Sequence, residues 1–116
     1  MEILPFKYYR LYITKNANGN NGYFSMNTFS MFETNESTTD LCIGATATAS
    51  SNYNASTDAP KAIDNNASTY WETTPTAGDK WFQVELPAAK KVRKLIITAT
   101  NYQREMPSAF IFQGYY

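Results

Sequence analysis

Short runs of aromatic and β-branched residues, each closed by turn-forming residues, constrain the fold of this chain more than any other feature. Such runs are typical of β-strands, and the Gly, Pro, Asn and Asp residues between them are typical of turns. Six runs predict strands, at residues 6–14, 23–32, 41–49, 81–86, 92–100 and 109–116. Short strands with little helix predict an all-β sandwich or barrel, and 116 residues allow one small domain.

The segments between the first strands predict how the chain turns. Residues 15–22, KNANGNNG, are all turn formers and predict a hairpin loop. Within residues 23–32 the apolar positions change register near Asn27 and Thr28, which predicts a bulge. Residues 33–40, ETNESTTD, are polar and aperiodic, so we interpret them as a linker.

Two prolines mark the second half of the chain. Residues 59–64, APKAID, permit one helical turn, with Asp58 as N-cap and Pro60 at the first helical position. Pro87 has no N–H for a central ladder, so we expect it to end the strand at residues 81–86.

Composition excludes several classes of function. The formal net charge is zero and the Lys and Arg residues are scattered, so we expect neither a nucleic-acid partner nor membrane insertion. The first residues, MEILPFKYYRLYI, do not form a recognisable signal peptide. The chain has no His, which rules out Ser–His and Cys–His nucleophile pairs, and we expect no enzyme activity. The single cysteine, Cys42, lies in an apolar pattern and is predicted to be a small core residue.

A longer pattern in the middle of the chain carries a family resemblance. From Ala47 to Trp71 the sequence ATASSNYNASTDAPKAIDNNASTYW ends in Thr-x-Trp, and it is followed by Trp-x-x-Val-x-Leu at residues 81–86. This order resembles the opening half of a discoidin domain, the coagulation factor 5/8 type C family, which includes the family 32 carbohydrate-binding modules. The resemblance implies a galactose-binding-like jelly-roll β-sandwich that binds a ligand and does not catalyse a reaction.

The order of the resembling parts is unusual. Residues 6–32, which begin FKYYRLYIT, resemble the closing hairpin of such a domain, whereas residues 41–116 resemble its opening half. Residues 33–40 join the two. We interpret residues 1–116 as one circularly permuted and shortened sandwich. Two alternatives stay open: the junction of two tandem domains, and a subunit whose missing strands come from another chain.

The resemblance implies a structural calcium ion in the loop after the short helical turn. The matching residues are Lys61, Asp64, Asn66 and Thr69, whose carbonyl, carboxylate and hydroxyl oxygens are the hard ligands that calcium prefers. Thr28 aligns where the family often has a closing-strand Glu, so we expect weak binding. The alternative is that Asp64 and Thr69 only stabilise the loop.

The resemblance also implies a sugar site on the loops at one end of the sandwich. The predicted ligand-binding residues are Asn52, Tyr53, Tyr70, Glu72, Tyr102 and Arg104. Tyr102 with Arg104 is the favoured pair, because a flat ring stacks on a pyranose and a guanidinium holds two adjacent hydroxyls. The alternative is that the rim tyrosines pack against the sandwich.

Three other residues are expected to support the fold. Trp71 and Trp81 match core positions of the family, and Arg10 is expected to form an ion pair across the sandwich with Glu85.

Two functions follow as hypotheses. The first is a carbohydrate-binding or adhesion module that recognises a glycan outside the cell or on a virion surface. The alternative is a structural assembly subunit, such as a virion decoration or tail component, whose partners are other protein subunits. An assembly subunit should bury an edge strand, residues 109–116 or 6–14, against a neighbour.

Overall fold

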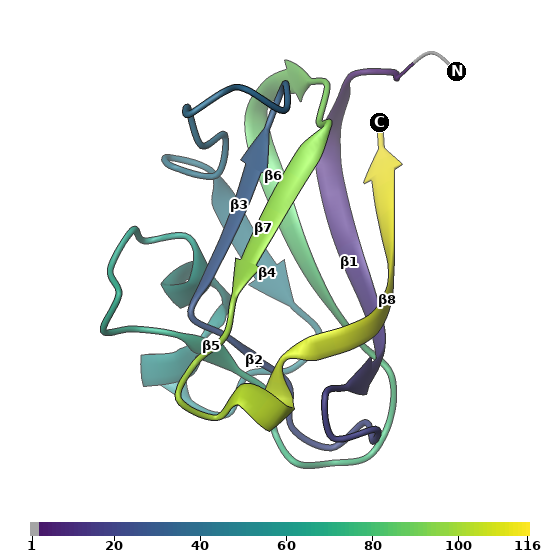
Figure 1. Ribbon diagram of the computed structural model, residues 1–116, viewed down its shortest axis with the longest axis vertical. Coiled ribbons are helices and arrows are strands. Elements are labelled where there is room, and N and C mark those ends of the chain that lie inside the picture. The colour runs from purple at the N-terminus through teal and green to yellow at the C-terminus, as the bar shows by residue number, and fades with distance from the viewer. Residues whose placement is uncertain (1–2) are drawn as a thin grey trace.

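The computed structural model describes residues 3–116, and within them the fold is built almost entirely of antiparallel strands (Figure 1). The eight strands are β1 (Phe6–Asn16), β2 (Ser25–Met26), β3 (Thr28–Phe32), β4 (Thr46–Ala49), β5 (Trp71–Glu72), β6 (Lys80–Lys90), β7 (Lys94–Thr98) and β8 (Pro107–Tyr115). Three short 3-10 helices, η1 (Ala55–Thr57), η2 (Ala59–Ala62) and η3 (Gln103–Glu105), lie in the loops. The prediction of an all-β sandwich is confirmed.

The main sheet has the strand order β4-β6-β1-β8. β1 lies at its centre because it pairs antiparallel with β6 on one side and with β8 on the other, where Leu11 faces both Phe82 and Phe112. Its alternating residues Tyr9, Leu11 and Ile13 are buried, as expected for a strand with one face on the core.

A second, thinner layer covers part of this sheet. It consists of two separate strand pairs, β3 with β7 and β2 with β5, seen in front of β6 and β4 in Figure 1. The extended segment is interrupted at Asn27, between β2 and β3, where the sequence predicts a change of register. Because of this break, side chains from both strands reach one core, whose fully buried members include Leu11, Ile13, Phe24, Met26, Phe29, Met31, Cys42, Trp71, Phe82, Val84 and Leu86.

The predicted hairpin between residues 6–14 and 23–32 is wrong. β1 and β3 lie in different layers, with β1 paired to β6 and β8 and β3 paired to β7. The Asn- and Gly-rich residues 15–22 cross from one layer to the other. The buried Asn16 organises this crossing, because its carboxamide oxygen accepts hydrogen bonds from the backbone N–H groups of Asn18 and Asn20, at 3.0 and 3.2 Å.

Several strand boundaries also differ from the predictions, and β1 (Phe6–Asn16) and β8 (Pro107–Tyr115) each differ by one or two residues at an end. Of residues 41–49 only Thr46–Ala49 form a strand, because the Asp40 carboxylate holds residues 41–44 in a turn by accepting from Cys42 N–H. Pro87 lies inside β6, within the register shift where Phe6 pairs with Lys90, so its missing N–H removes no regular ladder bond. Strand β7 is shorter than expected and spans Lys94–Thr98.

The predicted helical turn is present as the 3-10 helix η2, with Asp58 at the N-cap position. The Asp58 side chain makes no capping hydrogen bond and instead forms an ion pair with Lys61 at 3.3 Å. The preceding helix η1 was not predicted; its Asn54 and Thr57 form a capping box.

The predicted ion pair between Arg10 and Glu85 is wrong. Glu85 pairs with Lys7 at 3.5 Å, whereas Arg10 lies over the Trp81 ring at 4.1 Å and donates a hydrogen bond to Gln83. Trp81 is therefore half-buried on the outer face of the sheet, whereas Trp71 lies in the core as expected. The reason is alternation: Lys80 and Phe82 point inward, so Trp81 between them points outward.

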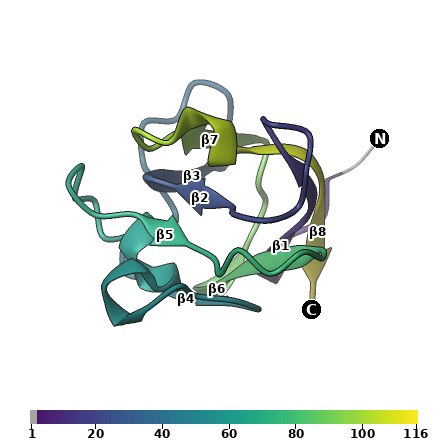
Figure 2. The ribbon, with the colours of Figure 1, turned by 90° about the horizontal axis from the view of Figure 1, so that it is seen from below.

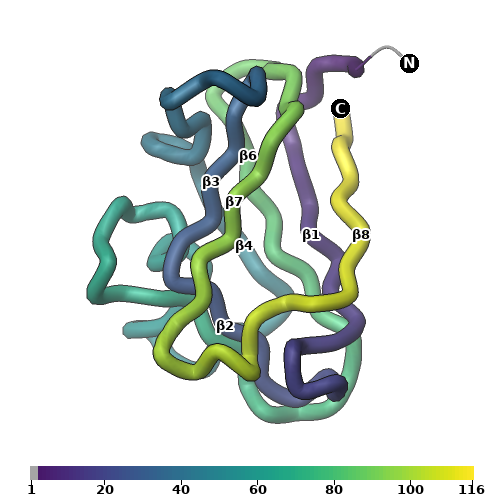
Figure 3. The backbone as a smooth tube through the Cα atoms, viewed as in Figure 1, coloured from purple at the N-terminus to yellow at the C-terminus, as the bar shows by residue number. Residues whose placement is uncertain are grey.

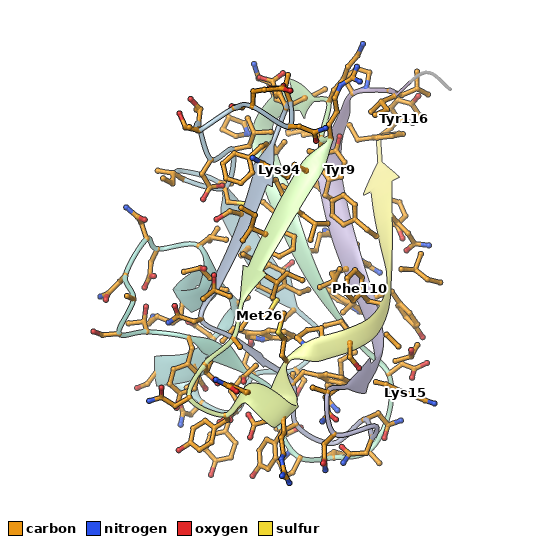
Figure 4. All side chains as sticks on the ribbon, viewed as in Figure 1. Tyr9, Lys15, Met26, Lys94, Phe110 and Tyr116 are labelled. Carbon is orange, nitrogen blue, oxygen red and sulfur yellow. The ribbon has the colours of Figure 1, made fainter. Side chains whose placement is uncertain are left out.

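One side of the sandwich is open between β7 and β8 (Figures 1 and 3). Among the described residues each of these strands pairs on one edge only. Phe110, labelled in Figure 4, faces the inner side with Ile13 but stays 39% exposed, because no strand covers it. Farther along β8, beside Phe112, an apolar hollow of about 340 Å³ is lined by Ile3, Leu4, Phe6, Tyr9, Val92, Phe112 and Gly114.

The two ends of the described chain lie beside this open side. Tyr8 pairs with Tyr115, and the rings of Phe6 and Tyr116 are 4.8 Å apart between their centroids. The Phe6 ring packs so tightly on Gly114 that a Cβ there would lie 2.3 Å from it. Glycine at this position therefore allows the two strands to approach closely.

Candidate functional site

The candidate site is the end of the sandwich that carries β5, helix η3 and the loops around them, which Figure 2 views from below. Strand β5 is short, and buried Trp71 fixes its position. The Trp71 indole N–H lies within hydrogen-bond distance of the Ser51 carbonyl and of the Asn52 amide oxygen, at 3.1 and 3.2 Å. These contacts hold the loop at residues 50–53 against β5, and Tyr53 N–H donates to the Glu72 carbonyl at 2.7 Å.

The four predicted metal-binding residues meet around one hydroxyl. The Thr69 Oγ1 lies 2.6 Å from the Asp64 carboxylate, 3.1 Å from the Asn66 carbonyl and 3.3 Å from the Lys61 carbonyl. The Thr69 hydroxyl has one proton to donate, and backbone N–H groups supply further donors, from Thr69 to the Asn66 carbonyl at 3.2 Å and from Asn66 to the Asp64 carboxylate at 3.1 Å. Such crowding of oxygen lone pairs fits a hard cation such as calcium, with Asp64 as the one formal negative charge.

The closing-strand residue that reaches this loop is Asn27, not the aligned Thr28. Thr28 pairs with Thr98 in the β3–β7 ladder. The Asn27 side-chain amide, at the break between β2 and β3, donates to the Ala67 and Thr69 carbonyls at 2.9 and 2.8 Å. A neutral side chain therefore holds the loop to the second layer.

Tyrosines and amides line a cleft beside this loop. The cleft, of about 590 Å³, lies between the loops at residues 67–70 and 99–102. Its lining consists of Asn27, Ala67, Ser68, Tyr70, Ala99, Thr100, Asn101 and Tyr102. Tyr102 is 57% exposed and also lines a neighbouring hollow of about 480 Å³ formed by residues 101–105. The backbone of Tyr102 is held by the Thr100 hydroxyl, which accepts from its N–H at 3.0 Å.

Two carboxyl groups lie in contact at the base of this end. Glu72 on β5 is buried, with 8% of its surface exposed, and its side chain contacts that of Glu105 on η3. Burial, together with the hydrogen bond and the charge of Glu105, raises the pKa of Glu72 to about 8. The same two carboxylates contribute to the raised pKa values of Tyr23 and Tyr70, in which loss of solvent is the largest cause. These four side chains are therefore electrostatic neighbours.

The structure brings all six predicted ligand-binding residues to one end of the molecule, in different settings. Tyr70 and Tyr102 share the cleft, and Glu72 lies behind them. Tyr53 is 51% exposed and lies beside Tyr23, with ring centroids 6.2 Å apart. The other two are Asn52, which is tied to Trp71, and Arg104, which lines the neighbouring hollow. Tyr53 and Tyr102 are each more than half exposed, whereas Tyr70 is half-buried.

Sequence reasoning missed Tyr23 and Glu105. Glu105 lies in the same loop as Tyr102 and Arg104, which were predicted. The sequence gives no sign that this loop brings Glu105 close to Glu72 on β5; only the fold shows it. Tyr23 follows the Asn- and Gly-rich loop that was predicted to close a hairpin. Because that segment crosses between layers instead, it carries Tyr23 to the site.

The chain belongs to the F5/8 type C domain family, whose model matches residues 46–115. The match covers more than half of the chain and contains most of the site, whereas residues 6–32 lie outside it. Domains of this family are generally non-catalytic binding modules, and many bind carbohydrate. No curated protein and no solved structure matches the chain. Among the described residues, no helix is long and apolar enough to cross a membrane.

Proposed function

We propose that this protein is a non-catalytic carbohydrate-binding module that uses the cleft between residues 67–70 and 99–102. The observation that carries the proposal is the composition of that cleft, which combines tyrosines with the amides of Asn27 and Asn101 in a domain of the F5/8 type C family. Flat rings give apolar contact to the C–H face of a sugar. The Asn101 amide can donate to and accept from its hydroxyls, and the Asn27 amide oxygen can accept from them. The lining of the cleft contains no Leu, Ile, Val, Met or Phe, which favours a polar ligand.

Tyr102 and Arg104 have the leading roles in this proposal. The exposed Tyr102 ring stacks on the sugar, and the Arg104 guanidinium in the neighbouring hollow holds hydroxyls of the next unit. Tyr70 forms the opposite wall of the cleft. Asn52 and Tyr53 lie at the far rim, where they would contact a longer glycan.

A structural calcium ion in the loop at residues 61–69 is part of the proposal. The ligands would be the carbonyls of Lys61 and Asn66, the Asp64 carboxylate and the Thr69 hydroxyl. The convergence of these oxygens on the Thr69 hydroxyl supports the assignment. The ion would hold one wall of the cleft, because Ala67 and Ser68 belong to both the loop and the cleft lining.

Alanine variants test the sugar site. Replacing a stacked tyrosine removes about 1–2 kcal/mol of binding, so Tyr102→Ala should weaken glycan affinity about tenfold. Arg104→Ala should weaken it by a similar factor. Tyr115→Ala is the matched control, since Tyr115 is an exposed tyrosine on β8 outside the cleft. Binding is measured on a glycan array and then by titration calorimetry. Equal loss in all three variants would contradict the proposal.

A specific observation favours a second candidate, an assembly subunit that pairs with a second copy of itself through β8. This strand, PSAFIFQGY, has no charged residue, and its edge away from β1 pairs with no other strand of the described chain. Natural edge strands usually carry charges or bulges that prevent pairing. Ile111 and Tyr115 are exposed on its outer face, at 57% and 40%.

Solution mass tests this second candidate. Ile111→Lys should turn a dimer into a monomer, whereas Ile43→Lys, at an equally exposed isoleucine in the turn at residues 41–44, should not. A wild-type monomer at high concentration would leave glycan binding as the only function supported. Either role would place the protein outside the cell or on a virion surface, as the sequence led us to expect.

A further inference from the structure

The outer face of the main sheet carries a row of polar side chains that crosses all four strands. The strand register places Gln83 of β6 and Gln113 of β8 on either side of Arg10 of β1. Thr48 of β4 continues the row beside Gln83. Each position alternates with core-facing residues of its strand, so the four side chains stand on the side away from the core. With about 4.8 Å between neighbouring strands the row is about 14 Å long, which suits an extended ligand.

Hydrogen bonds within this row leave N–H donors free at its centre. The Gln83 amide oxygen accepts from Arg10 Nε at 2.9 Å, and the Gln113 amide oxygen accepts from the Tyr115 hydroxyl at 2.7 Å. Both carboxamide oxygens are therefore engaged. Among the described residues, the NH2 groups of the two glutamines and the Nη groups of Arg10 donate to no protein acceptor. The free groups are thus N–H donors around one positive charge, an arrangement that fits an anion.

No carboxylate of the described chain neutralises Arg10. Glu85 lies on the same face but forms its ion pair with Lys7, at 3.5 Å. Asp79 accepts a hydrogen bond from the Tyr12 hydroxyl at 3.2 Å and forms no ion pair with Arg10. The guanidinium therefore keeps its full charge and two unpaired Nη groups for a partner from outside.

Aromatic rings hold this guanidinium in place. Its central carbon lies 4.1 Å from the Trp81 ring centroid and 5.5 Å from that of Tyr115, so it is attracted to a ring from each neighbouring strand. The same rings belong to two aromatic pairs that border the polar row. Tyr12 pairs with Trp81 on one side of the row. Tyr8 pairs with Tyr115 on the other. A side chain held in this way loses little freedom when it binds a ligand.

We propose that this face is a binding site for an acidic polysaccharide, whose carboxylate or sulfate group pairs with the Arg10 guanidinium. The NH2 groups of Gln83 and Gln113 donate to the same group or to neighbouring hydroxyls, and the bordering rings contact the C–H faces of the sugar units. The site shares no residue with the cleft at residues 67–70 and 99–102. It is therefore a second binding surface, independent of the function proposed for that cleft.

A second copy of this chain fits the face less well than a polysaccharide does. The core of a protein–protein interface is apolar and poor in charge, whereas the middle of this face is a guanidinium flanked by two amides. The aliphatic contribution of the bordering rows is Ile111, at the edge strand β8. A copy would also have to supply a carboxylate for Arg10, and the Glu85 of this face is already paired with Lys7.

Calorimetric titration of the intact protein tests the site with probes that differ in charge. The first two probes are a galacturonic acid hexamer and its neutral methyl ester. A charge-assisted pair of hydrogen bonds to Arg10 predicts that the acid binds at least about tenfold more tightly than the ester. The preference should shrink when salt is raised to about 0.5 M. A sulfated hexasaccharide without carboxylates shows which of the two anionic groups binds better, and Arg10-dependent binding of either acidic probe supports the proposal.

Two variants on the face and one control away from it assign the preference to Arg10. Arg10→Gln removes the charge and should reduce the preference for the acid to less than about twofold. Gln113→Glu keeps an acceptor for the Tyr115 hydroxyl but places a carboxylate beside Arg10, so it should also abolish the preference. Arg93→Gln, at an exposed arginine outside the main sheet, should retain it. Thermal unfolding of each variant confirms that it is folded.

The outcomes separate this site from the cleft. Equal affinity for the acid and the ester, or no binding of any acidic probe, would overturn the inference. If the preference survives in Arg10→Gln but disappears in Arg104→Ala, the anion binds at the cleft and the sheet-face site is wrong. A change from dimer to monomer in Arg10→Gln, without acid binding, would make the face a contact between copies and refute the site. Failure of the cleft, measured with neutral glycans and Tyr102→Ala, leaves Arg10-dependent binding unaffected.

Discussion

Lys80 and Glu72 are both ionisable and buried, yet the fold surrounds one of them with partners and not the other. The Lys80 ammonium lies 2.6 to 3.2 Å from four backbone carbonyls, those of Asn21, Gly22, Thr76 and Gly78. Among the described residues, no Lys or Arg forms an ion pair with Glu72, whose carboxyl group lies beside that of Glu105. A buried charge with a full set of partners serves the fold, whereas a buried charge without them marks a place where a ligand or a proton is needed.

The loop at residues 61–69 falls between these two cases. It has one carboxylate, that of Asp64, and a hydroxyl that can satisfy only one of the oxygens around it. The loop is closed without a metal ion, but an ion would satisfy more of its oxygens. The comparison therefore ranks three sites by how much each needs a partner from outside, with Lys80 lowest and the Glu72–Glu105 pair highest.

The largest expected effect is the loss of stability when the buried Lys80 ammonium is removed. Lys80→Met removes the donor from four carbonyls that join the loops at residues 15–22 and 75–79, and should lower the free energy of unfolding by about 3 kcal/mol. Urea denaturation measures it. Lys15→Met, at an exposed lysine, should change stability by less than about 0.5 kcal/mol. If Lys80→Met lost no more stability than Lys15→Met, the four hydrogen bonds from Lys80 to backbone carbonyls would not stabilise the fold.

Calcium should give the next largest effect. At a concentration about 100-fold above the dissociation constant, calcium should raise the free energy of unfolding by about 2.7 kcal/mol. Asp64→Asn removes the only negative charge of the loop and should abolish the increase, whereas Asp79→Asn, at an exposed aspartate, should retain it. Thermal unfolding with and without a chelator measures this. An unchanged midpoint in the wild type would refute the metal assignment.

The contact between Glu72 and Glu105 should make the stability of the protein depend on pH. The pKa of Glu72 in the folded protein is about 8, above the ordinary value of 4.5. The folded state therefore binds the proton more tightly, and this contribution is present at acid pH and lost as the pH rises through 8. Stability should therefore fall as the pH rises from 5 to 9.

Glu72→Gln isolates that contribution. The amide cannot ionise, so the variant should match the wild type near pH 5 and exceed its stability near pH 9. Glu36→Gln, at an exposed glutamate, should retain the wild-type slope. Parallel curves for the wild type and Glu72→Gln would show that the pair does not repel.

The smallest expected effect concerns Asn27. Asn27→Asp replaces the amide donor to the Ala67 and Thr69 carbonyls, and should cost about 1 kcal/mol without calcium. It also adds a carboxylate beside the loop, so calcium should bind more tightly than in the wild type. Calorimetric titration with calcium tests this, with Asn35→Asp as the control at an exposed site. Weaker calcium binding in Asn27→Asp would place the ion elsewhere.

The sequence predicts the strands, because each is a run of aromatic or β-branched residues ended by turn formers. It also predicts the loop at residues 61–69, where the four predicted residues meet as expected. Strand partners were harder to predict. The hairpin between residues 6–14 and 23–32 is the natural local choice, but β1 gains more by pairing on both edges with β6 and β8, at long range.

The candidate site could be predicted only in part for the same reason. Tyr70, Glu72 and Tyr102 follow from the family resemblance. Glu105 and Tyr23 reach the site through the packing of η3 and of the crossing loop against β5, and neither packing has a local signal. The aligned Thr28 was one residue away from Asn27, because a break between two strands shifts which side chain faces the loop. The permuted order of residues 6–32 and 41–116 remains a prediction.

The most direct test of the central claim is to map glycan contacts by nuclear magnetic resonance on the isotope-labelled protein. A neutral glycan that binds on the array should shift the backbone signals of residues 67–70 and 99–105 and leave those of residues 107–115 unchanged. Shifts concentrated along β8 and the apolar hollow beside Phe112, with none at Glu72 or Tyr102, would contradict the account.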